Sequence, residues 1–185
     1  MRVISGNRKG HRLKGPKNKK IRPTEDRIKE SLFNILGPIN PDALVLDLFA
    51  GSGSIGIEFL SRGAKKAYFV DISSASISLI KENLQNTKLM EKATVMKRDS
   101  IRAIKCFKDK STRFDYIYID PPFREDKLIF DALEVIDNTN ILADKGIIII
   151  EHWEGLGFED KYLGYKNIDC RKYGSKSITF FAPNS

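Results

Sequence analysis

The stretch from Asp47 to Glu58, DLFAGSGSIGIE, carries the first group of residues that could do chemistry. Gly51 and Gly53 can take positive φ and let a ligand approach the main chain, and a helix beginning after them would offer unpaired N–H groups. The G-x-G-x-x-G spacing is shared with purely structural turns, so it predicts a nucleoside pocket only together with the preceding strand. Asp47 would repel a pyrophosphate and attract a cation, which favours a positively charged ligand.

The tetrapeptide Asp120-Pro121-Pro122-Phe123 is the second group, and it follows the apolar run 114–119. Two prolines stop the strand and make a stiff loop at its carboxyl end, although a rigid turn is the alternative interpretation. Asp120 and the Pro121 carbonyl could accept both hydrogens of an amino group, and Phe123 could stack on a base. An amino nitrogen held in this way is aimed at an electrophile, and its base must first leave the helical stack. The mechanism needs no cysteine nucleophile.

Alternating strands and helices are expected to position these groups. Apolar runs predict parallel strands at 43–46, 65–71, 93–99, 114–119 and 147–151, with a hairpin from 166–172 and 176–181 at the end. Amphipathic segments predict helices over 23–36, 55–60, 74–87 and 128–138. The pattern predicts an α/β, Rossmann-like fold with a mostly parallel seven-stranded sheet flanked by helices.

Two further acids close predicted strands, where ligands bind in such sheets. Asp71 lies about twenty residues after the glycine turn, at the position that accepts hydrogen bonds from ribose hydroxyls. A helix N-cap is its alternative role. Asp99, followed by Ser100, could accept the amino group of an adenine, and a local turn-forming role is the alternative.

Positive charge is concentrated at the N-terminus. The chain of 185 residues has a net charge of +8, yet residues 1–24 contain no acid. Two short strands, 2–5 and 11–14, could pair there, so we expect a basic arm over residues 1–22 and one domain over residues 23–185. The arm is predicted to bind the phosphates of a nucleic acid, and a disordered solubilising tail is the alternative. The proposed contacts are Arg8, Lys9, Arg12, Lys14, Lys17, Lys19, Lys20 and Arg22.

Several protein classes do not fit the composition. The longest aliphatic run, 147–150, is too short for a membrane span or a signal peptide, which favours a cytoplasmic protein without membrane contact. Cys106 and Cys170 lack C-x-x-C spacing, and His11 and His152 are scattered, so neither a disulfide nor a metal site is expected. We expect a monomer.

The two motifs and the basic start together resemble a known family. D-x-F-x-G-x-G and D-P-P-F resemble motifs I and IV of class I methyltransferases, which use S-adenosylmethionine. Arg2–Gly6, Ile21–Leu36, Val45–Glu58, Leu60–Ala64 and Tyr173-Gly174 resemble bacterial 16S rRNA guanine-N2 methyltransferases of the RsmD type. Lys176 departs from that family, which more often has a small polar residue there.

The resemblance implies a substrate and a set of site residues. The substrate would be the exocyclic N2 of a guanine in small-subunit rRNA, presented as ribosomal RNA or on a partly assembled particle. Catalytic residues would be Asp120, Pro121, Pro122 and Phe123, with no metal. The cofactor-binding set would be Asp47, Phe49, Ala50, Gly51, Ser52, Gly53, Asp71, Ile72, Asp99 and Ser100.

Three other functions are compatible with parts of the sequence. An adenine-N6 or other nucleic-acid amino methyltransferase would share both motifs. A nicotinamide-dependent oxidoreductase would explain the glycine spacing but give the Asp120–Phe123 tetrapeptide no role. A non-catalytic RNA-binding domain would explain only the basic arm.

Overall fold

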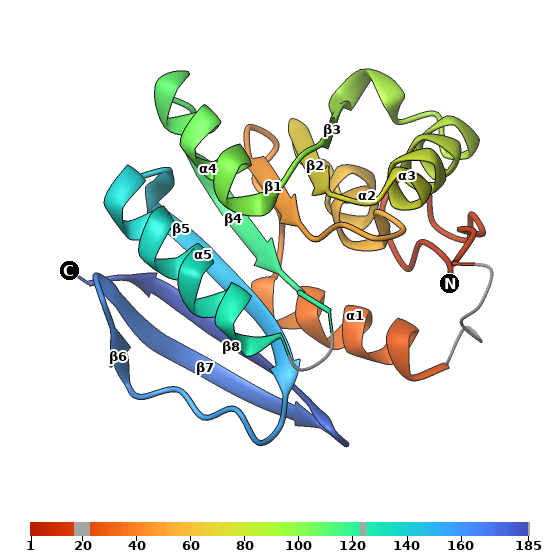
Figure 1. Cartoon of the computed structure of the whole chain (residues 1–185). Helices are drawn as coiled ribbons and strands as arrows, with labels where there is room; N and C mark the ends of the chain where they lie inside the picture. The colour runs from red at the N-terminus through yellow and green to blue at the C-terminus, as the bar shows by residue number, and fades with distance from the viewer. Residues whose placement is uncertain (17–22, 123–124, 185) are drawn as a thin grey trace. The chain divides into compact units, whose positions relative to one another are not determined.

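A computed structural model describes residues 1–16, 23–122 and 125–184. The chain divides into two compact units, Met1–Lys97 and Arg98–Ser185, and each is described by itself. Figure 1 follows the chain through both units from the N-terminus to the C-terminus.

Unit Met1–Lys97 contains a parallel sheet of the order β3-β2-β1. Its strands are β1 (Leu44–Leu48), β2 (Lys66–Asp71) and β3 (Ala93–Lys97). Its helices are α1 (Pro23–Leu36), α2 (Ser54–Ser61), α3 (Ser74–Asn86) and the short 3-10 helix η1 (Met90–Lys92). Because a helix follows β1 and another follows β2, both crossovers have the β-α-β form that parallel strands require.

The apolar strands of this unit form its core. Val45, Leu46 and Leu48 of β1 are fully buried, as expected for a strand covered on both faces. Gly56 of α2 packs against the ring of Phe69, where an added Cβ would lie 2.3 Å from a ring carbon. This close packing fixes the start of α2 relative to β2.

The first sixteen residues fold onto this core. Arg2 and Arg12 form an isolated antiparallel bridge, and the Val3 amide donates to the His11 carbonyl at 2.9 Å. Val3 and Leu13 are buried. We call residues 1–14 the N-terminal hairpin; it has one bridge where two short paired strands were expected. The proposed boundary at residue 22 lies outside the described residues and stays a prediction.

Buried Glu58 of α2 holds the N-terminal hairpin in place. Its two carboxylate oxygens accept hydrogen bonds from the Ile4 and Ser5 amides at 2.8 and 2.9 Å. Arg62 donates to the same carboxylate at 2.9 Å, which offsets its buried charge. The N-terminal hairpin is therefore an integral part of unit Met1–Lys97.

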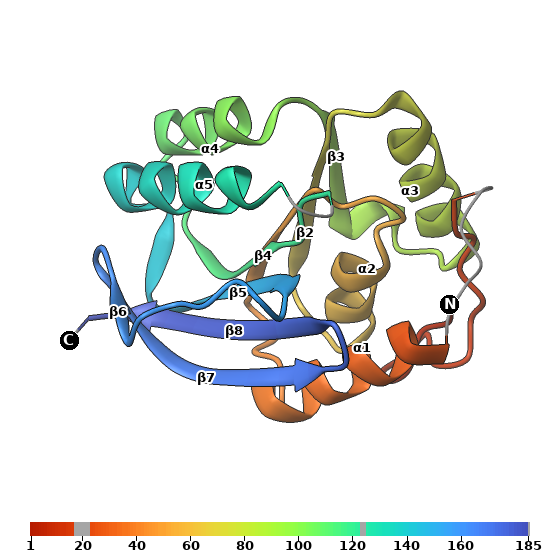
Figure 2. The same cartoon turned by 60° about the horizontal axis from the view of Figure 1, so that its bottom comes forward.

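Unit Arg98–Ser185 contains a mixed sheet of the order β4-β5-β8-β7-β6. Its strands are β4 (Phe114–Ile119), β5 (Leu142–Trp153), β6 (Lys161–Tyr162), β7 (Tyr165–Tyr173) and β8 (Lys176–Pro183). Among the described strands of this unit, only β4 and β5 pair in parallel. Helices α4 (Ser100–Asp109) and α5 (Asp126–Thr139) run side by side, as Figure 2 shows.

The α/β fold expected from the sequence is confirmed, because β1 to β5 pair in parallel within their units and helices separate them along the chain. Three details differ. The described residues contain eight strands where seven were expected, since the two-residue β6 adds an edge strand. β5 begins earlier, at Leu142, and α4 was not anticipated, although its buried Ala103, Ile104 and Phe107 recur at helical spacing.

The docking of the N-terminal hairpin can be tested at two glycines. Gly6 and Gly10 both have positive φ, at 83° and 85°, so alanine brings similar backbone strain at each. A Cβ at Gly6 would lie 1.9 Å from the Ser61 carbonyl oxygen, whereas one at Gly10 would meet nothing within 4 Å. Gly6→Ala should therefore lower the free energy of unfolding by about 1 to 3 kcal/mol more than Gly10→Ala. Urea denaturation of both variants measures the difference, and equal losses would contradict the docking.

Candidate functional site

The glycine turn between β1 and α2 has a backbone that few residues can adopt. Phe49, Gly51 and Gly53 all have positive φ, at 60°, 56° and 76°. The Ala50 amide donates to the Val70 carbonyl at 2.9 Å, which fastens the turn to β2. Space is open in front of Gly51, where an added Cβ would approach only the Phe49 carbonyl oxygen, at 3.9 Å. A ligand can therefore reach the main chain at this turn.

Asp47 lies buried beneath the same turn. Its carboxylate accepts a hydrogen bond from the Gly56 amide at 3.0 Å, in the first turn of α2. Burial raises the pKa of Asp47 to about 8; the hydrogen bond from Gly56 opposes that rise, and the charge of Asp71 adds to it. A cation bound at the turn would favour the ionised form of Asp47.

Asp71 binds the turn from the end of β2. One of its carboxylate oxygens accepts from the Gly51 amide at 2.9 Å, and the other accepts from the Ser73 amide at 2.8 Å. The N-cap of α3 is Ser73, whose hydroxyl accepts from the Ser76 amide, so Asp71 does not fill the capping role considered above. Ile72 beside it is 70% exposed and offers an apolar surface next to the turn.

Asp99 serves as the N-cap of α4 in the second unit. Its carboxylate accepts from the Arg102 amide at 3.0 Å, and Ser100 is buried at the start of the helix. The structure thus provides the local role that the sequence left as an alternative. A second contact, to an adenine, stays a prediction.

Asp120 directly follows β4 in the second unit and is half-buried. Pro121 is half-buried, Pro122 is exposed, and the Pro122 carbonyl accepts from the Glu125 amide at 3.0 Å. This bond turns the chain toward the start of α5. Phe123, the proposed stacking residue, lies outside the described residues.

A cluster that the sequence did not suggest lies at the end of β5. Glu151 is buried, accepts from the Tyr118 hydroxyl at 2.5 Å and forms an ion pair with Lys176 of β8. In the β4–β5 register Ile119 pairs with Ile150, so Asp120 and Glu151 each follow the last paired residue. Lys176 therefore has a structural role, because it pairs with a buried carboxylate beside the Asp120 loop.

The described basic residues of the N-terminal hairpin divide into two kinds. The Arg8 side chain donates to the Thr87 carbonyl at 2.6 Å, and Lys14 forms an ion pair with Glu82 at 2.5 Å. Lys9 and Arg12 are exposed and have no side-chain partner among the described residues. The remaining proposed contacts lie outside the described residues: Lys17, Lys19, Lys20 and Arg22.

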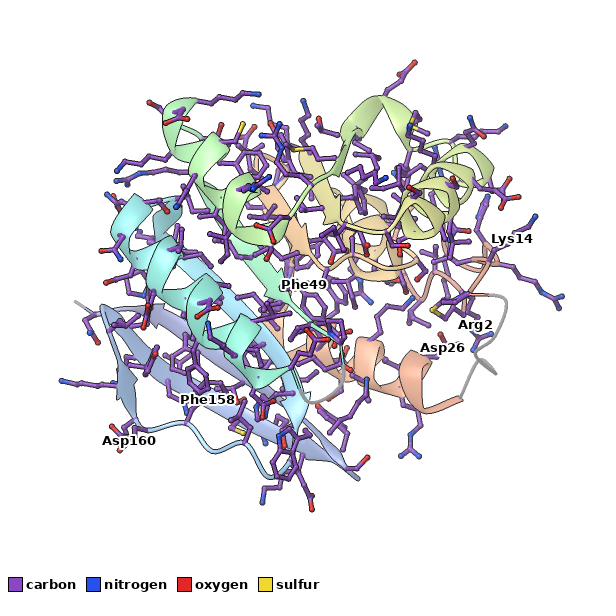
Figure 3. All side chains as sticks on the ribbon, in the orientation of Figure 1. Arg2, Lys14, Asp26, Phe49, Phe158 and Asp160 are labelled. Atoms are coloured by element: carbon purple, nitrogen blue, oxygen red, sulfur yellow. The ribbon has the colours of Figure 1, made fainter. Side chains whose placement is uncertain are left out.

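A cavity of about 460 Å³ lies between the N-terminal hairpin and α1. Arg2 is beside it and contacts Asp26, with Nε 3.8 Å from the carboxylate, and Figure 3 shows both residues. Sequence reasoning left Arg2 and Arg27 out of the nucleic-acid contacts because only the fold brings α1 beside the hairpin. The cavity is lined by Arg2, Val3, Ile4, Lys9, Gly10, Asp26, Arg27 and Glu30.

The described residues provide neither a metal-ligand group nor a membrane-spanning helix. No group of three or more histidines, cysteines and acids is close enough to hold a metal ion within the ranges given above. In the same part of the chain, each helix is too short or too polar to cross a membrane.

Comparison with known proteins gives a consistent picture. The family model for conserved hypothetical protein 95 matches residues 1–182. Bacillus subtilis YlbH, provisionally named an rRNA methyltransferase, is 43% identical to this chain, and the match covers 82% of this chain and 82% of the YlbH chain. Ribosomal RNA small subunit methyltransferase D of Escherichia coli K12 is 34% identical over 82% of this chain and 74% of its own. The solved structure of Escherichia coli YhhF, provisionally named a methyltransferase, has a TM-score of 0.85 at 27% identity and covers 100% of this chain and 98% of its own.

The pKa of Asp47 makes stability depend on pH. Since its folded-state pKa lies above the unfolded value near 4, the folded protein binds an extra proton between about pH 4 and pH 8. The free energy of unfolding should therefore fall as the pH rises through that range. Asp47→Asn cannot ionise, so its stability relative to wild type should increase by up to about 1.4 kcal/mol per pH unit.

Urea denaturation without ligand at several pH values between about 5 and 8 measures this difference. Asp42→Asn is the matched control, because the Asp42 side chain is 84% exposed. Its stability should track that of wild type. A difference between Asp47→Asn and wild type that stays constant with pH would rule out the buried, protonated carboxyl.

Proposed function

Because the chain belongs to the family of conserved hypothetical protein 95, we propose that it methylates the exocyclic N2 of a guanine in small-subunit rRNA. The chain is an S-adenosylmethionine-dependent rRNA methyltransferase with a class I methyltransferase fold. The single observation that carries the proposed reaction, methylation of an exocyclic amine, is a half-buried Asp120 at the carboxyl end of a parallel strand, followed directly by two prolines.

The glycine turn of unit Met1–Lys97 suits S-adenosylmethionine. The open space before Gly51 admits a ligand to the main chain, and Asp71 keeps lone pairs for ribose hydroxyls while it holds the Gly51 amide. Asp47 favours a cationic ligand, and the exposed Ile72 can pack against a base. When bound, this cofactor supplies an electrophilic methyl group on a sulfonium. The other proposed contacts are Phe49, Ala50, Ser52, Gly53, Asp99 and Ser100.

Asp120 and the Pro121 carbonyl would act on the target base. An exocyclic amine is a weak nucleophile because its lone pair is delocalised into the ring, and two acceptors can orient its hydrogens so that the lone pair faces the methyl donor. Methyl transfer would break the bond between the methyl group and the sulfonium as the N–C bond forms. The Asp120 carboxylate would stabilise the positive charge that develops on the nitrogen, until the nitrogen releases a proton. The stiffness of Pro121 and Pro122 keeps the acceptors in place, and Phe123 would stack on the base.

The choice of guanine rests chiefly on the resemblance of the basic start, Arg2–Gly6, and of Ile21–Leu36 to the RsmD type. An adenine-N6 enzyme would use the same pair of acceptors, so the described geometry alone does not favour either base. Identification of the methylated nucleoside separates the two.

Exposed Lys9 and Arg12 are proposed to contact the phosphates of the RNA. Arg2 and Arg27 line the 460 Å³ cavity beside Lys9 and are proposed to add to these phosphate contacts, although Asp26 and Glu30 line it too. We propose that the substrate is ribosomal RNA or a small-subunit assembly particle, met in the cytoplasm by a monomer of this chain. Lys17, Lys19, Lys20 and Arg22 would add to the phosphate contacts.

The proposed reaction predicts both the product and the effect of one substitution. With a labelled methyl donor and immature small subunits, the wild-type protein should yield N2-methylguanosine. Asp120→Ala should lower kcat about 100-fold to 1,000-fold, as loss of one preorganised transition-state contact typically does. It should still bind S-adenosylhomocysteine, because the cofactor contacts lie mainly at the glycine turn.

Asp144→Ala is the matched control. Asp144 is an acid of the same unit, and its side chain is 90% exposed although it pairs with Arg113. Its turnover should equal that of wild type. Labelled N6-methyladenosine would replace the guanine assignment with the adenine alternative. Wild-type turnover in Asp120→Ala would remove Asp120 from the mechanism.

RNA binding should respond to salt through Lys9 and Arg12. Each phosphate contact that is lost should reduce the slope of log affinity against log salt by about 0.7 to 0.9. Lys9→Ala and Arg12→Ala should each show this reduction in filter binding across a salt series. Arg8→Ala should chiefly lower stability, because its side chain caps the Thr87 carbonyl. Lys145→Ala, at an exposed position in the first half of β5, is the control and should leave the slope unchanged.

A further inference from the structure

Two buried side chains each contact the N-terminal hairpin and also either the glycine turn or the first residue of α2. The first is Asn83 of α3, which is fully buried. Its amide nitrogen donates to the Ser52 carbonyl at 2.9 Å and to the Lys14 carbonyl at 3.0 Å. Its oxygen accepts from the Lys14 amide at 2.8 Å. Asn83 thus joins the second half of the hairpin to the middle of the turn.

The second bridging side chain is Lys29 of α1, which is 2% exposed. Its ammonium donates to the Arg2 carbonyl at 2.6 Å and to the Ser54 hydroxyl at 3.0 Å, and it lies 3.6 Å from the Glu58 carboxylate. Lys29 therefore joins the first half of the hairpin to the point where the turn enters α2.

Burial makes both bridges costly to break at one end. If the hairpin moved away, the Asn83 amide and the Lys29 ammonium would each lose a partner in a site closed to water. The same holds if the turn rearranged, because Ser52 and Ser54 are the other partners. The hairpin and the turn are consequently expected to keep their native positions together.

We propose that Asn83 and Lys29 are positioning residues that couple RNA binding at the N-terminal hairpin to cofactor binding at the glycine turn. The inference rests on the function proposed above, because it takes the hairpin as the RNA contact and the turn as the cofactor site. Lys9 and Arg12 belong to the hairpin whose main chain the two bridges hold. RNA bound to them would keep Arg2 and Lys14 in place, and through the bridges it would keep Ser52 and Ser54 in place.

The sign of the coupling follows from the contacts. All hydrogen bonds of both bridges form in one relative position of the hairpin and the turn. A ligand that holds the hairpin in this position therefore also restricts the turn, and the second ligand loses less conformational entropy when it binds. The two ligands should therefore strengthen each other's binding. Linkage requires the effect to be equal in both directions.

The affinity for S-adenosylhomocysteine with and without RNA tests the coupling. Calorimetry gives the Kd of the full-length protein alone and with a saturating small-subunit rRNA transcript, and the ratio of the two values is the coupling factor. For wild type we expect a factor of about five or more, the lower end of typical allosteric coupling. Asn83→Ala and Lys29→Met should each bring the factor close to one.

Matched controls separate coupling from a general loss of stability. Asn86→Ala removes an exposed asparagine from the same helix, and Lys81→Met removes an exposed lysine. Both should keep the wild-type factor. Each variant is first checked for a cooperative thermal transition. Ser54→Ala, which removes only the turn end of the Lys29 bridge, replaces any bridging variant that does not fold and should also reduce the factor.

Two results would overturn the coupling. One is a wild-type factor of one, with both ligands binding; the other is an unchanged factor in folded Asn83→Ala and Lys29→Met. A wild-type protein that does not bind S-adenosylhomocysteine at all would instead contradict the proposed function. A factor lost in the bridging variants and kept in Asn86→Ala and Lys81→Met would support the coupling.

Discussion

The hydrogen bond from the Gly56 amide to the buried Asp47 carboxyl is the contact on which the glycine turn depends. It ties the end of β1 to the first turn of α2, and the residues between must then follow a path with positive φ at Phe49, Gly51 and Gly53. Burying an acid is unfavourable without a compensating partner, and here the pKa rises to about 8. A cationic ligand at the turn would offset that cost, which links the packing of the core to the chemistry of the cofactor.

From this turn, polar side chains extend to the N-terminus of the chain. Asn83 and Lys29 contact the N-terminal hairpin and also either the turn or the first residue of α2, and Glu58 binds two amides of the hairpin. A basic N-terminal segment is often an appended tail, but these sixteen residues share buried contacts with three helices. The proposed RNA contacts Lys9 and Arg12 therefore lie on a hairpin whose main chain is held by buried side chains.

The second unit positions its acid by a different means. Parallel pairing of β4 and β5 ends at Ile119 and Ile150, and two prolines then prevent the ladder from continuing beyond Asp120. Beside it, the Glu151 carboxylate is satisfied by the Tyr118 hydroxyl and by Lys176. Because Lys176 neutralises the Glu151 carboxylate, electrostatic repulsion between Glu151 and the neighbouring Asp120 is reduced.

The sequence alone determined the α/β fold, the glycine turn and the Asp120-Pro121-Pro122 loop, because apolar periodicity and the positions of glycine and proline act locally along the chain. It gave no sign of Glu151, Asn83 or Lys29 as site-supporting residues, and it left the role of Asp99 open. Those roles depend on which side chains meet after folding: Asn83 lies 31 residues from Ser52, and Glu151 lies 33 residues from Tyr118. Only the tertiary structure shows that the Arg8 side chain binds the Thr87 carbonyl and that Lys14 pairs with Glu82. Both partners lie far away in the sequence, and folding brings them beside the N-terminal hairpin.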